Sequence, residues 1–276
     1  MFVTQTSQSQ TFLANRATGH IGLSVVAADG VTRRAQVHEH GSLRARFPNT
    51  HDGALEVVIV NTGGGMTGGD RFTVDMAVGE GGSLVAGTTA AEKIYRSTGP
   101  AAELNVTLKV GAGGKLAWLP QETILFDRAK LLRRIDIDLA GNATLIMVEA
   151  VVFGRAAMGE AIADGSFLDH WRVRRDGGLI YADTAKLDGD IAGQLGRRAV
   201  AEGGIAMATV LLTPGGASEL ERVRAIGENF TGEVGISAWN GVAVARLIAK
   251  DGATLRHDII ALLAGLGTAV PRLWLQ

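Results

Sequence analysis

Apolar and polar residues alternate with a period of two along much of this 276-residue chain. In the segment 71–78 (RFTVDMAV), the apolar residues Phe72, Val74, Met76 and Val78 occupy every second position. Because successive side chains of a β-strand point to opposite faces, this pattern is typical of a strand with one buried face. The same alternation recurs in the segments 103–110 (ELNVTLKV) and 134–139 (RIDIDL). The chain is therefore predicted to be mainly β.

A similar glycine-containing turn follows each of these strands. The segments 78–84 (VGEGGSL), 110–116 (VGAGGKL) and 139–145 (LAGNATL) align without gaps and are spaced 32 and 29 residues apart. The chain holds 38 glycines and 5 prolines, which favours many tight turns between short strands. A degenerate repeat of this kind predicts stacked strands in a β-helical, solenoid-like core. A flattened antiparallel sandwich is the alternative.

Two segments near the C-terminus have the spacing of helices. The segment 218–230 opens with Ser218 and carries Glu221 three positions later, which is a capping-box pattern. In the segment 254–267 the apolar residues at helical spacing are Leu255, Ile259, Leu262 and Leu266. No linker or break in composition divides the chain. Residues 1–276 are therefore predicted to form a single domain with about two C-terminal α-helices.

The composition argues against several classes of function. The net charge is −1, so no strong field attracts nucleic acid or an anionic membrane. The absence of cysteine excludes disulfides and thiolate metal sites, and it fits a reducing compartment. The N-terminus lacks the pattern of a secretory signal, and the longest apolar stretch, 145–153, is too short to span a bilayer. We therefore expect a cytoplasmic protein that binds neither membranes nor nucleic acids.

The segment 61–72 (NTGGGMTGGDRF) contains a G-x-G-x-x-G pattern at Gly63, Gly65 and Gly68. In a dinucleotide-binding turn, a helix must follow the glycines, because its N-terminus holds the pyrophosphate. Here the glycines lead into the alternating segment 71–78, which predicts a strand. The pattern is therefore interpreted as a tight connection between strands rather than as a nucleotide site.

Several segments, taken in order, closely resemble the family of urease accessory proteins UreD, called UreH in some organisms. The most specific of them are NTGGGMTGGDR (61–71), AAEKIYRS (90–97), LPQETILFDRAKL (119–131) and GRAAMGE (154–160). Flanking segments that agree are HGSLRARFP (40–48), RRDGGLIYAD (174–183) and VPRLW (270–274). Each segment alone is a weak signal, but the ordered set is specific and extends over nearly the whole chain.

The resemblance implies a maturation factor for urease that is not itself an enzyme. Members of this family are described as mostly β proteins with a stacked, helical arrangement of strands and two helices. The family works in a complex with UreF and the GTPase UreG on apo-urease, and it is thought to pass nickel through an internal tunnel. The resemblance therefore implies transient nickel(II) binding and no tightly bound cofactor.

Nickel that must be released again suits oxygen or imidazole ligands, which exchange more readily than a closed thiolate cage. Glu149 is the clearest candidate, because it lies in the segment 145–153 (LIMVEAVVF), where both faces of the strand are apolar. A buried carboxylate is costly without a partner. Glu149 is therefore expected either to form an internal ion pair, with Arg155 or Arg133, or to line a water-filled path.

Three further carboxylates are candidates for a transient nickel path. Asp70 ends the glycine-rich segment, and it either points into such a path or caps its own loop. Glu92 and Glu122 lie in segments that carry the family resemblance. The plainer interpretations are a local salt bridge of Glu92 with Lys93 or Arg96, and a solvated turn at Glu122.

His38 and His40 are weaker metal candidates. They are two residues apart, so on a strand they would share a face and could bind a metal together. Two imidazoles supply only half of a tetrahedral site. Histidines on a solvated surface are the alternative interpretation.

The sequence alone leaves two other functions open. One is an enzyme that depends on a nucleotide cofactor held by the glycine-rich loop 63–69. The other is a β-solenoid scaffold that binds proteins without any metal. Only the cofactor-dependent enzyme requires binding of nicotinamide or flavin nucleotides. Neither the enzyme nor the scaffold requires a role for nickel.

Overall fold

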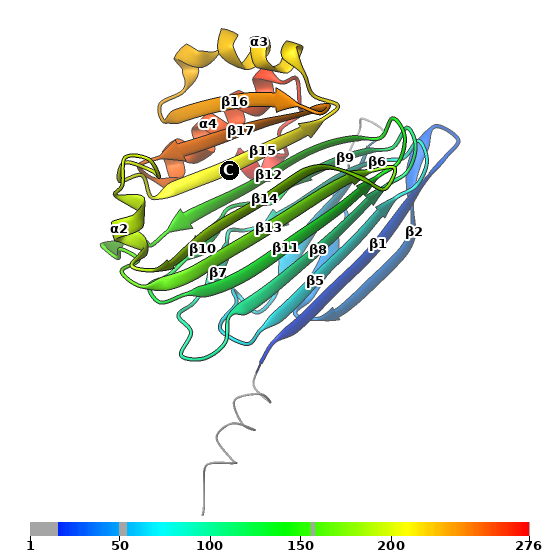
Figure 1. Ribbon diagram of the computed structural model, residues 1–276. Helices are drawn as coiled ribbons and strands as arrows, with labels where there is room; N and C mark the ends of the chain where they lie inside the picture. Colours follow the sequence, from blue (N-terminus) through cyan, green and yellow to red (C-terminus); the bar gives the residue numbers. More distant parts are fainter. Residues whose placement is uncertain (1–15, 50–53, 156–157, 276) are drawn as a thin grey trace, which may run out of the picture.

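The computed structural model describes residues 16–49, 54–155 and 158–275, which fold into two stacked β-sheets with helices at one edge (Figure 1). Sheet A has seven strands in the order β14-β13-β11-β8-β5-β1-β2. Sheet B has ten strands in the order β16-β17-β15-β12-β9-β6-β4-β3, and its remaining two strands pair as β7 with β10 and β10 with β12. The chain is thus mainly β, as predicted.

The strands have the following bounds. Sheet A consists of β1 (Thr18–Ala28), β2 (Val31–Gly41), β5 (Arg71–Val78), β8 (Ala102–Val110), β11 (Lys130–Leu139), β13 (Gly165–Arg175) and β14 (Gly178–Gly189). Sheet B consists of β3 (Leu43–Arg46), β4 (Leu55–Asn61), β6 (Ser83–Thr89), β7 (Glu92–Ile94), β9 (Lys115–Leu119), β10 (Thr123–Leu125), β12 (Thr144–Phe153), β15 (Ala206–Thr213), β16 (Glu233–Trp239) and β17 (Val242–Ala249).

The central part of the chain winds between the two sheets as a β-solenoid of about four turns. Successive long strands alternate between sheet B and sheet A, from β4 and β5 through to β12 and β13. Neighbours within each sheet are parallel: β5, β8, β11 and β13 in one, and β4, β6, β9 and β12 in the other. This confirms the predicted solenoid-like core. The parallel pairing shows that the alternative, an antiparallel sandwich, is wrong.

The aligned turns of the sequence lie directly on one another in the structure. Val78 pairs with Val110, and Val110 pairs with Leu139, so the three turns start at the same level of the stack. Backbone hydrogen bonds join successive turns, and the side-chain oxygen of Asn142 accepts the amide of Gly113 at 2.7 Å. The gap-free alignment of the three turns in the sequence therefore matches the register in which β5, β8 and β11 pair.

The main hydrophobic core fills the space between the sheets. The apolar face of β5 is part of it, and Phe72, Val74, Met76 and Val78 are each no more than 3% exposed. Burial of such side chains contributes about 1.5–3 kcal/mol each. The period-two pattern therefore indicates which face of the stacked strands β5, β8, β11 and β13 points toward sheet B.

A second core lies on the other face of sheet B, under the C-terminal helices. The helices over this core are α3 (Ala217–Ala225) and α4 (Gly252–Gly265), with 3-10 turns at Gly227–Asn229 and Arg272–Trp274, whereas α2 (Ile191–Leu195) packs against the main core. Leu255, Ile259 and Leu262 of α4 pack there against β12, β15 and β17. The two predicted C-terminal helices are therefore confirmed as α3 and α4, and α2 is an additional short helix.

The start of α3 differs from the sequence prediction. The helix follows Gly216, and the carboxylate of Glu219 accepts the amide of Gly216 at 2.7 Å. The capping box predicted at Ser218 and Glu221 is therefore wrong by two residues. Ser218 cannot be the N-cap because it already lies inside the first turn of the helix. Glu219, in the same turn, takes the role predicted for Glu221, because a carboxylate near the N-terminus of a helix is favoured.

The C-terminal segment is tied to sheet B. Trp274 is buried, and its Nε1 donates to the carbonyl of Leu119 at 3.0 Å. The side-chain amide of Gln121 donates to the carbonyl of Leu273 at 2.6 Å. Trp274 thus belongs to the core next to β9. Among the described residues, no helix has both the length and the apolar character needed to cross a lipid bilayer.

Candidate functional site

Glu149 lies on β12, and both faces of this strand are buried, as the sequence predicted. Its side chain points into the space between the sheets and is 6% exposed. The guanidinium of Arg133, on β11, forms an ion pair with one carboxylate oxygen of Glu149, and the indole Nε1 of Trp118 donates to the other at 2.7 Å. The predicted internal ion pair therefore exists, and its cation is Arg133 rather than Arg155.

Arg133 also binds a second buried carboxylate, Asp169 on β13. The guanidinium donates from Nε to Oδ1 at 2.9 Å and from Nη2 to Oδ2 at 2.6 Å, in a bidentate arrangement. One cation thus serves two carboxyl groups, so the cluster of Arg133, Glu149 and Asp169 has an excess negative charge only when both carboxyl groups are ionised. Sequence reasoning missed Asp169, although the alternation of Phe167, Asp169 and Trp171 places it on the apolar face of its strand.

The protonation of the cluster reflects its burial. Burial raises the pKa of Glu149, and the nearby Asp169 adds to this, while Arg133 opposes it. For Arg133, burial lowers the pKa, but the charges of Asp169 and Glu149 outweigh it and keep the guanidinium protonated. Burial therefore favours a proton on Glu149, and with that proton the cluster is neutral.

An internal cavity of about 50 Å³ adjoins the cluster. Apolar side chains from both sheets form most of its wall, and the polar groups on it are few. They are Thr88, Glu92, Gln121, Thr123, Arg133 and Glu149, together with the indole of Trp118. The cavity therefore brings together two of the carboxylates selected from sequence, Glu92 and Glu149, although they are far apart in the chain.

Glu92, at the start of β7, also lines a pocket of about 270 Å³ formed with the glycine-rich loop. Its carboxylate accepts a hydrogen bond from Nδ2 of Asn61 at 2.9 Å. Burial raises the pKa of Glu92 to about 7, and the hydrogen bond from Asn61 opposes this only in part. In the described structure Glu92 forms no salt bridge with Lys93 or Arg96. A carboxylate that titrates near neutral pH thus lies between this pocket and the internal cavity.

Asp70 is 4% exposed, and backbone amides occupy both of its carboxylate oxygens. Oδ1 accepts the amide of Ala17 at 2.8 Å, and Oδ2 accepts the amide of Thr67 at 2.8 Å. Asp70 is not among the residues that line the internal cavity. The geometry therefore matches the loop-capping interpretation of this residue.

Glu122 lies beyond the cavity wall, where its carboxylate accepts a hydrogen bond from Nη2 of Arg256 at 2.9 Å. This contact links the segment before β10 to helix α4. Glu122 is therefore paired and partly buried rather than part of a solvated turn, and the structure does not bring it together with Glu92 and Glu149.

His38 and His40 lie on the exposed edge strand β2 and share a face, as expected from their spacing. His40 pairs with His20 of β1 across the sheet, and the rings of His20 and His38 are 5.0 Å apart. Nε2 of His20 lies 2.9 Å from the carboxylate of Asp75. Among the described residues, however, no group of three or more histidine, aspartate or glutamate side chains is arranged to hold a metal ion.

The glycine-rich loop leads into strand β5, so no helix N-terminus follows it. Gly65 has a φ of +147°, and a Cβ there would lie 2.7 Å from the carbonyl oxygen of Lys93 and 2.5 Å from the ring of Tyr95. The glycine thus allows the loop to pack against β7. The geometry that a dinucleotide turn requires is absent from this loop.

The family model of the UreD urease accessory protein matches residues 17–275.

The chain belongs to the UreD family.

Individual UreD proteins agree over the whole length. A urease accessory protein UreD of Rhodopseudomonas palustris strain HaA2 is 56% identical over 273 residues, which cover 99% of this chain and 98% of that protein. A urease accessory protein UreD of Bradyrhizobium diazoefficiens strain USDA 110 is 56% identical over 268 residues, covering 97% of both chains. The names of these relatives describe an accessory protein, and family membership supports a role in urease maturation.

The four most specific of the segments that resemble UreD, 61–71, 90–97, 119–131 and 154–160, meet at one end of the solenoid. Met66 of the glycine-rich loop forms backbone hydrogen bonds with β7 and with the residue after it, donating to Lys93 at 2.7 Å and accepting from Tyr95 at 2.8 Å. Strand β7 pairs with β10, and β10 pairs with β12. The amide of Asp127 then donates to the carboxylate of Glu160 at 2.9 Å. Residues far apart in the chain, from the glycine-rich loop to Glu160, therefore form one continuous structure at this end of the solenoid.

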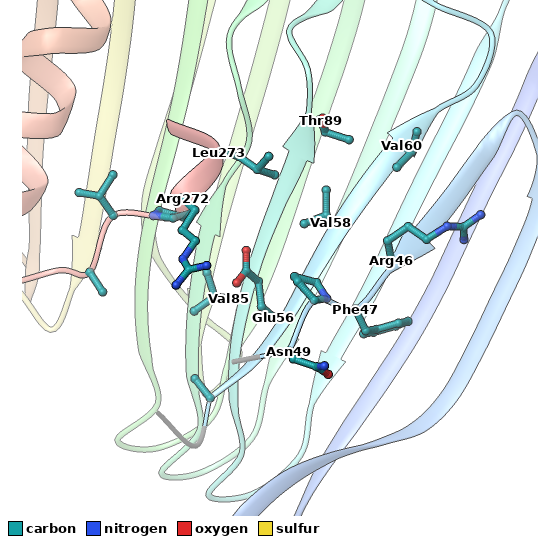
Figure 2. A pocket seen from close by; sticks show the side chains of 15 residues that line it. Arg46, Phe47, Asn49, Glu56, Val58, Val60, Val85, Thr89, Arg272 and Leu273 are labelled. Atoms are coloured by element: carbon teal, nitrogen blue, oxygen red, sulfur yellow. The ribbon is translucent and has the colours of Figure 1, made fainter. Parts of the chain in front are cut away.

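A groove larger than the internal cavity and the pocket of Glu92 lies elsewhere on the molecule. It has a volume of about 770 Å³ and runs over the outer face of sheet B between β4 and the C-terminal segment. Figure 2 shows the side chains of Arg272 and Glu56 pointing toward each other, with Val58 and Val85 nearby. It meets the pocket beside the glycine-rich loop at Thr89, which lines both. None of the carboxylates selected from sequence lines this groove.

The raised pKa of Glu92 predicts a stability effect that depends on pH. Because the folded-state pKa is about 7 against an ordinary 4.5, the protonated form stabilises the fold below pH 4.5, and this contribution is lost as the pH rises through 7. Glu92→Gln is therefore expected to be more stable than the wild type by about 2 kcal/mol at pH 8, allowing about 1.4 kcal/mol per pKa unit and partial screening by solvent.

Urea unfolding of both proteins between pH 4.5 and pH 8 measures this effect. The difference between Glu92→Gln and the wild type is expected to grow with pH across this window and to vanish at its lower end. Glu80→Gln, at an exposed turn on the other end of the solenoid, is the control and should show no such trend. A difference that is constant with pH would show that Glu92 has an ordinary pKa.

Proposed function

We propose that this UreD family member is a maturation factor that joins UreF and the GTPase UreG on apo-urease and helps to deliver nickel to the urease active site. It has no turnover of its own, and nickel is its cargo rather than a resident cofactor. The match to the UreD family over residues 17–275 supports the role in urease maturation. The chain has no cysteine, so we also place this activity in the reducing cytoplasm.

The observation that carries the nickel part of the proposal is the position of Glu92 and Glu149. Glu92 lines both a pocket beside the glycine-rich loop and the internal cavity. Glu149 lines the same cavity, and it shares a single cation, Arg133, with the second buried carboxyl group, Asp169. We infer a route for the ion from the pocket, past Glu92, to the cluster of Arg133, Glu149 and Asp169. Carboxylate oxygens hold nickel less tightly than thiolates, which suits a site that must release it.

Each group on this route has a separate role. Glu92 exchanges a proton for the incoming ion, because its pKa of about 7 leaves both forms populated at neutral pH. Glu149 and Asp169 supply the negative charge that stabilises a cation in the interior. Arg133 neutralises part of this charge, so that the carboxylates can stay buried when no ion is present. Asp70 and Glu122 stabilise neighbouring loops and lie outside the route.

Co-expression with UreF, UreG and apo-urease tests the proposal. The chain is expected to co-purify with these proteins as a complex, and urease in that complex is expected to become active when nickel is supplied. A chain that associates with none of them, under any nucleotide or nickel condition, would show that the proposed function is wrong. Binding of nicotinamide or flavin nucleotides to the isolated chain would instead favour a cofactor-dependent enzyme.

A further inference from the structure

The segment 269–275 borders the groove on the outer face of sheet B, and we call it the C-terminal strap. It leaves the end of helix α4 after Gly267, which has a φ of +73°. In the described structure, its backbone–backbone hydrogen bonds join Trp274 to Pro271 and Leu275 to Arg272, so they stay inside the strap. The strap is therefore held by side chains rather than by pairing with a strand or a helix.

Two polar side chains tie the strap to the rest of the molecule. Nε2 of Gln121 donates to the carbonyl of Leu273 at 2.6 Å, and Nη1 of Arg256 donates to the carbonyl of Trp274 at 3.4 Å. Nη2 of Arg256 also donates to Oε1 of Gln121, so the side-chain amide of Gln121 is fixed at both ends. The indole of Trp274 is the buried anchor of the strap.

Gln121 also separates two hollows that lie on opposite faces of sheet B. It is 7% exposed and lines the internal cavity, whereas its partner Leu273 lines the outer groove (Figure 2). Its backbone amide donates at 2.8 Å to Oγ1 of Thr88, which lines the same cavity. Gln121 lies in the connection between β9 and β10, so it is not itself part of a strand of the sheet. The contact between Gln121 and Leu273 therefore closes the sheet at this point.

We propose that the C-terminal strap closes a second opening of the internal cavity, toward the outer groove, and that the hydrogen bond from Gln121 to Leu273 holds it shut. The inference rests on the proposed function, because this cavity is the one that we propose carries nickel, and it adds a regulated opening to that route. A segment with few backbone hydrogen bonds to its neighbours opens at a low cost in free energy. When the strap moves away, the amide of Gln121 loses its acceptor, and water that enters the opening satisfies it.

Access to the cavity tests this inference. The chain has no cysteine, so Thr123→Cys places a single thiol at a cavity residue that is 5% exposed. Alkylation of this thiol by iodoacetamide is followed by mass spectrometry on the isolated chain. Adding Gln121→Glu removes the donor to Leu273, while the carboxylate still accepts from Arg256. The rate is expected to rise by roughly tenfold, which is the effect of losing one buried hydrogen bond on the opening equilibrium.

Gln194→Glu in the same Thr123→Cys background is the matched control. The side-chain amide of Gln194 also donates to a backbone carbonyl, that of Asp188 at 2.7 Å, but it lies in α2 and does not line the cavity. This change should leave the alkylation rate as it is. Hydrogen exchange on the same proteins shows which segment opens: Gln121→Glu should accelerate exchange in the strap and leave the buried part of α4 unchanged.

Three results would overturn the inference. They are an alkylation rate that Gln121→Glu leaves unchanged, a faster rate with unchanged hydrogen exchange in the strap, and faster exchange in α4 as well, which would indicate general loosening of the fold. The test uses neither nickel nor a partner protein, so its failure leaves the proposed function standing. Conversely, if the chain fails to associate with the urease proteins on co-expression, the proposed function is wrong, whereas a positive access test still establishes the opening.

Discussion

Replacing Arg133 by methionine is expected to lower the free energy of unfolding by about 3–5 kcal/mol. Arg133 is 1% exposed and binds the buried carboxylates of Glu149 and Asp169. Its removal leaves two charges in the interior without a cation, and their desolvation is then uncompensated. Urea unfolding at pH 7.5, followed by circular dichroism, gives the difference. A loss below about 1 kcal/mol would show that the cluster does not have the geometry described here.

A compensated variant is the control for this loss. In Arg133→Met/Glu149→Gln/Asp169→Asn, no charge is left in the cluster, so most of the lost stability should return. The single variant should also recover at low pH. Without Arg133, the pKa of each carboxyl is raised in the folded state, so the fold is stabilised by protonation and the deficit grows as the pH rises. A deficit that does not change with pH would point to lost packing of the arginine side chain instead.

Replacing Glu149 by glutamine is expected to lower the activation of urease by roughly tenfold or more, which is typical when a group that supports a metal is lost. The fold should survive this change, because Arg133 keeps its bidentate pairing with Asp169 and the new amide oxygen can still accept from Trp118. Urease activity after co-expression in nickel-containing medium measures the effect, with the amount of assembled complex determined on the same samples.

Two controls make this result specific. Glu80→Gln, at the opposite end of the solenoid, should activate urease like the wild type. Glu92→Gln should reduce activation as Glu149→Gln does, because both residues line the same cavity. Loss of activation that follows loss of complex would indicate a structural defect, and normal activation by Glu149→Gln would exclude this residue from the nickel route.

The solenoid could be predicted from the sequence because its strand register follows from repeated turns that are each local in the chain. The turns beginning at Val78, Val110 and Leu139 align without gaps, and the structure stacks them at the same level. The burial of Glu149 followed from the apolar residues on both sides of it. Both predictions depend only on neighbours in the chain and on the period of a β-strand.

The composition of the site could be predicted only in part, because it depends on pairings between distant strands. Asp169 meets Arg133 because β13 lies beside β11, and no local pattern names this pair. Glu92 reaches the cavity because β7 pairs with β10, which in turn pairs with β12. Asp70 could not be assigned from sequence, since its two partners include Ala17, which is distant in the chain. Such contacts are set by the fold as a whole.

The most direct test of the proposed route is the nickel content of urease itself. Urease is purified after incubation with UreF, UreG, nickel and either the wild-type chain or Glu149→Gln, and bound nickel is counted by mass spectrometry per active site. The proposed route predicts complexes of equal composition but at least roughly tenfold less nickel in the urease treated with Glu149→Gln. Equal nickel in the two samples would contradict the proposal that the ion passes through the cavity beside Glu149.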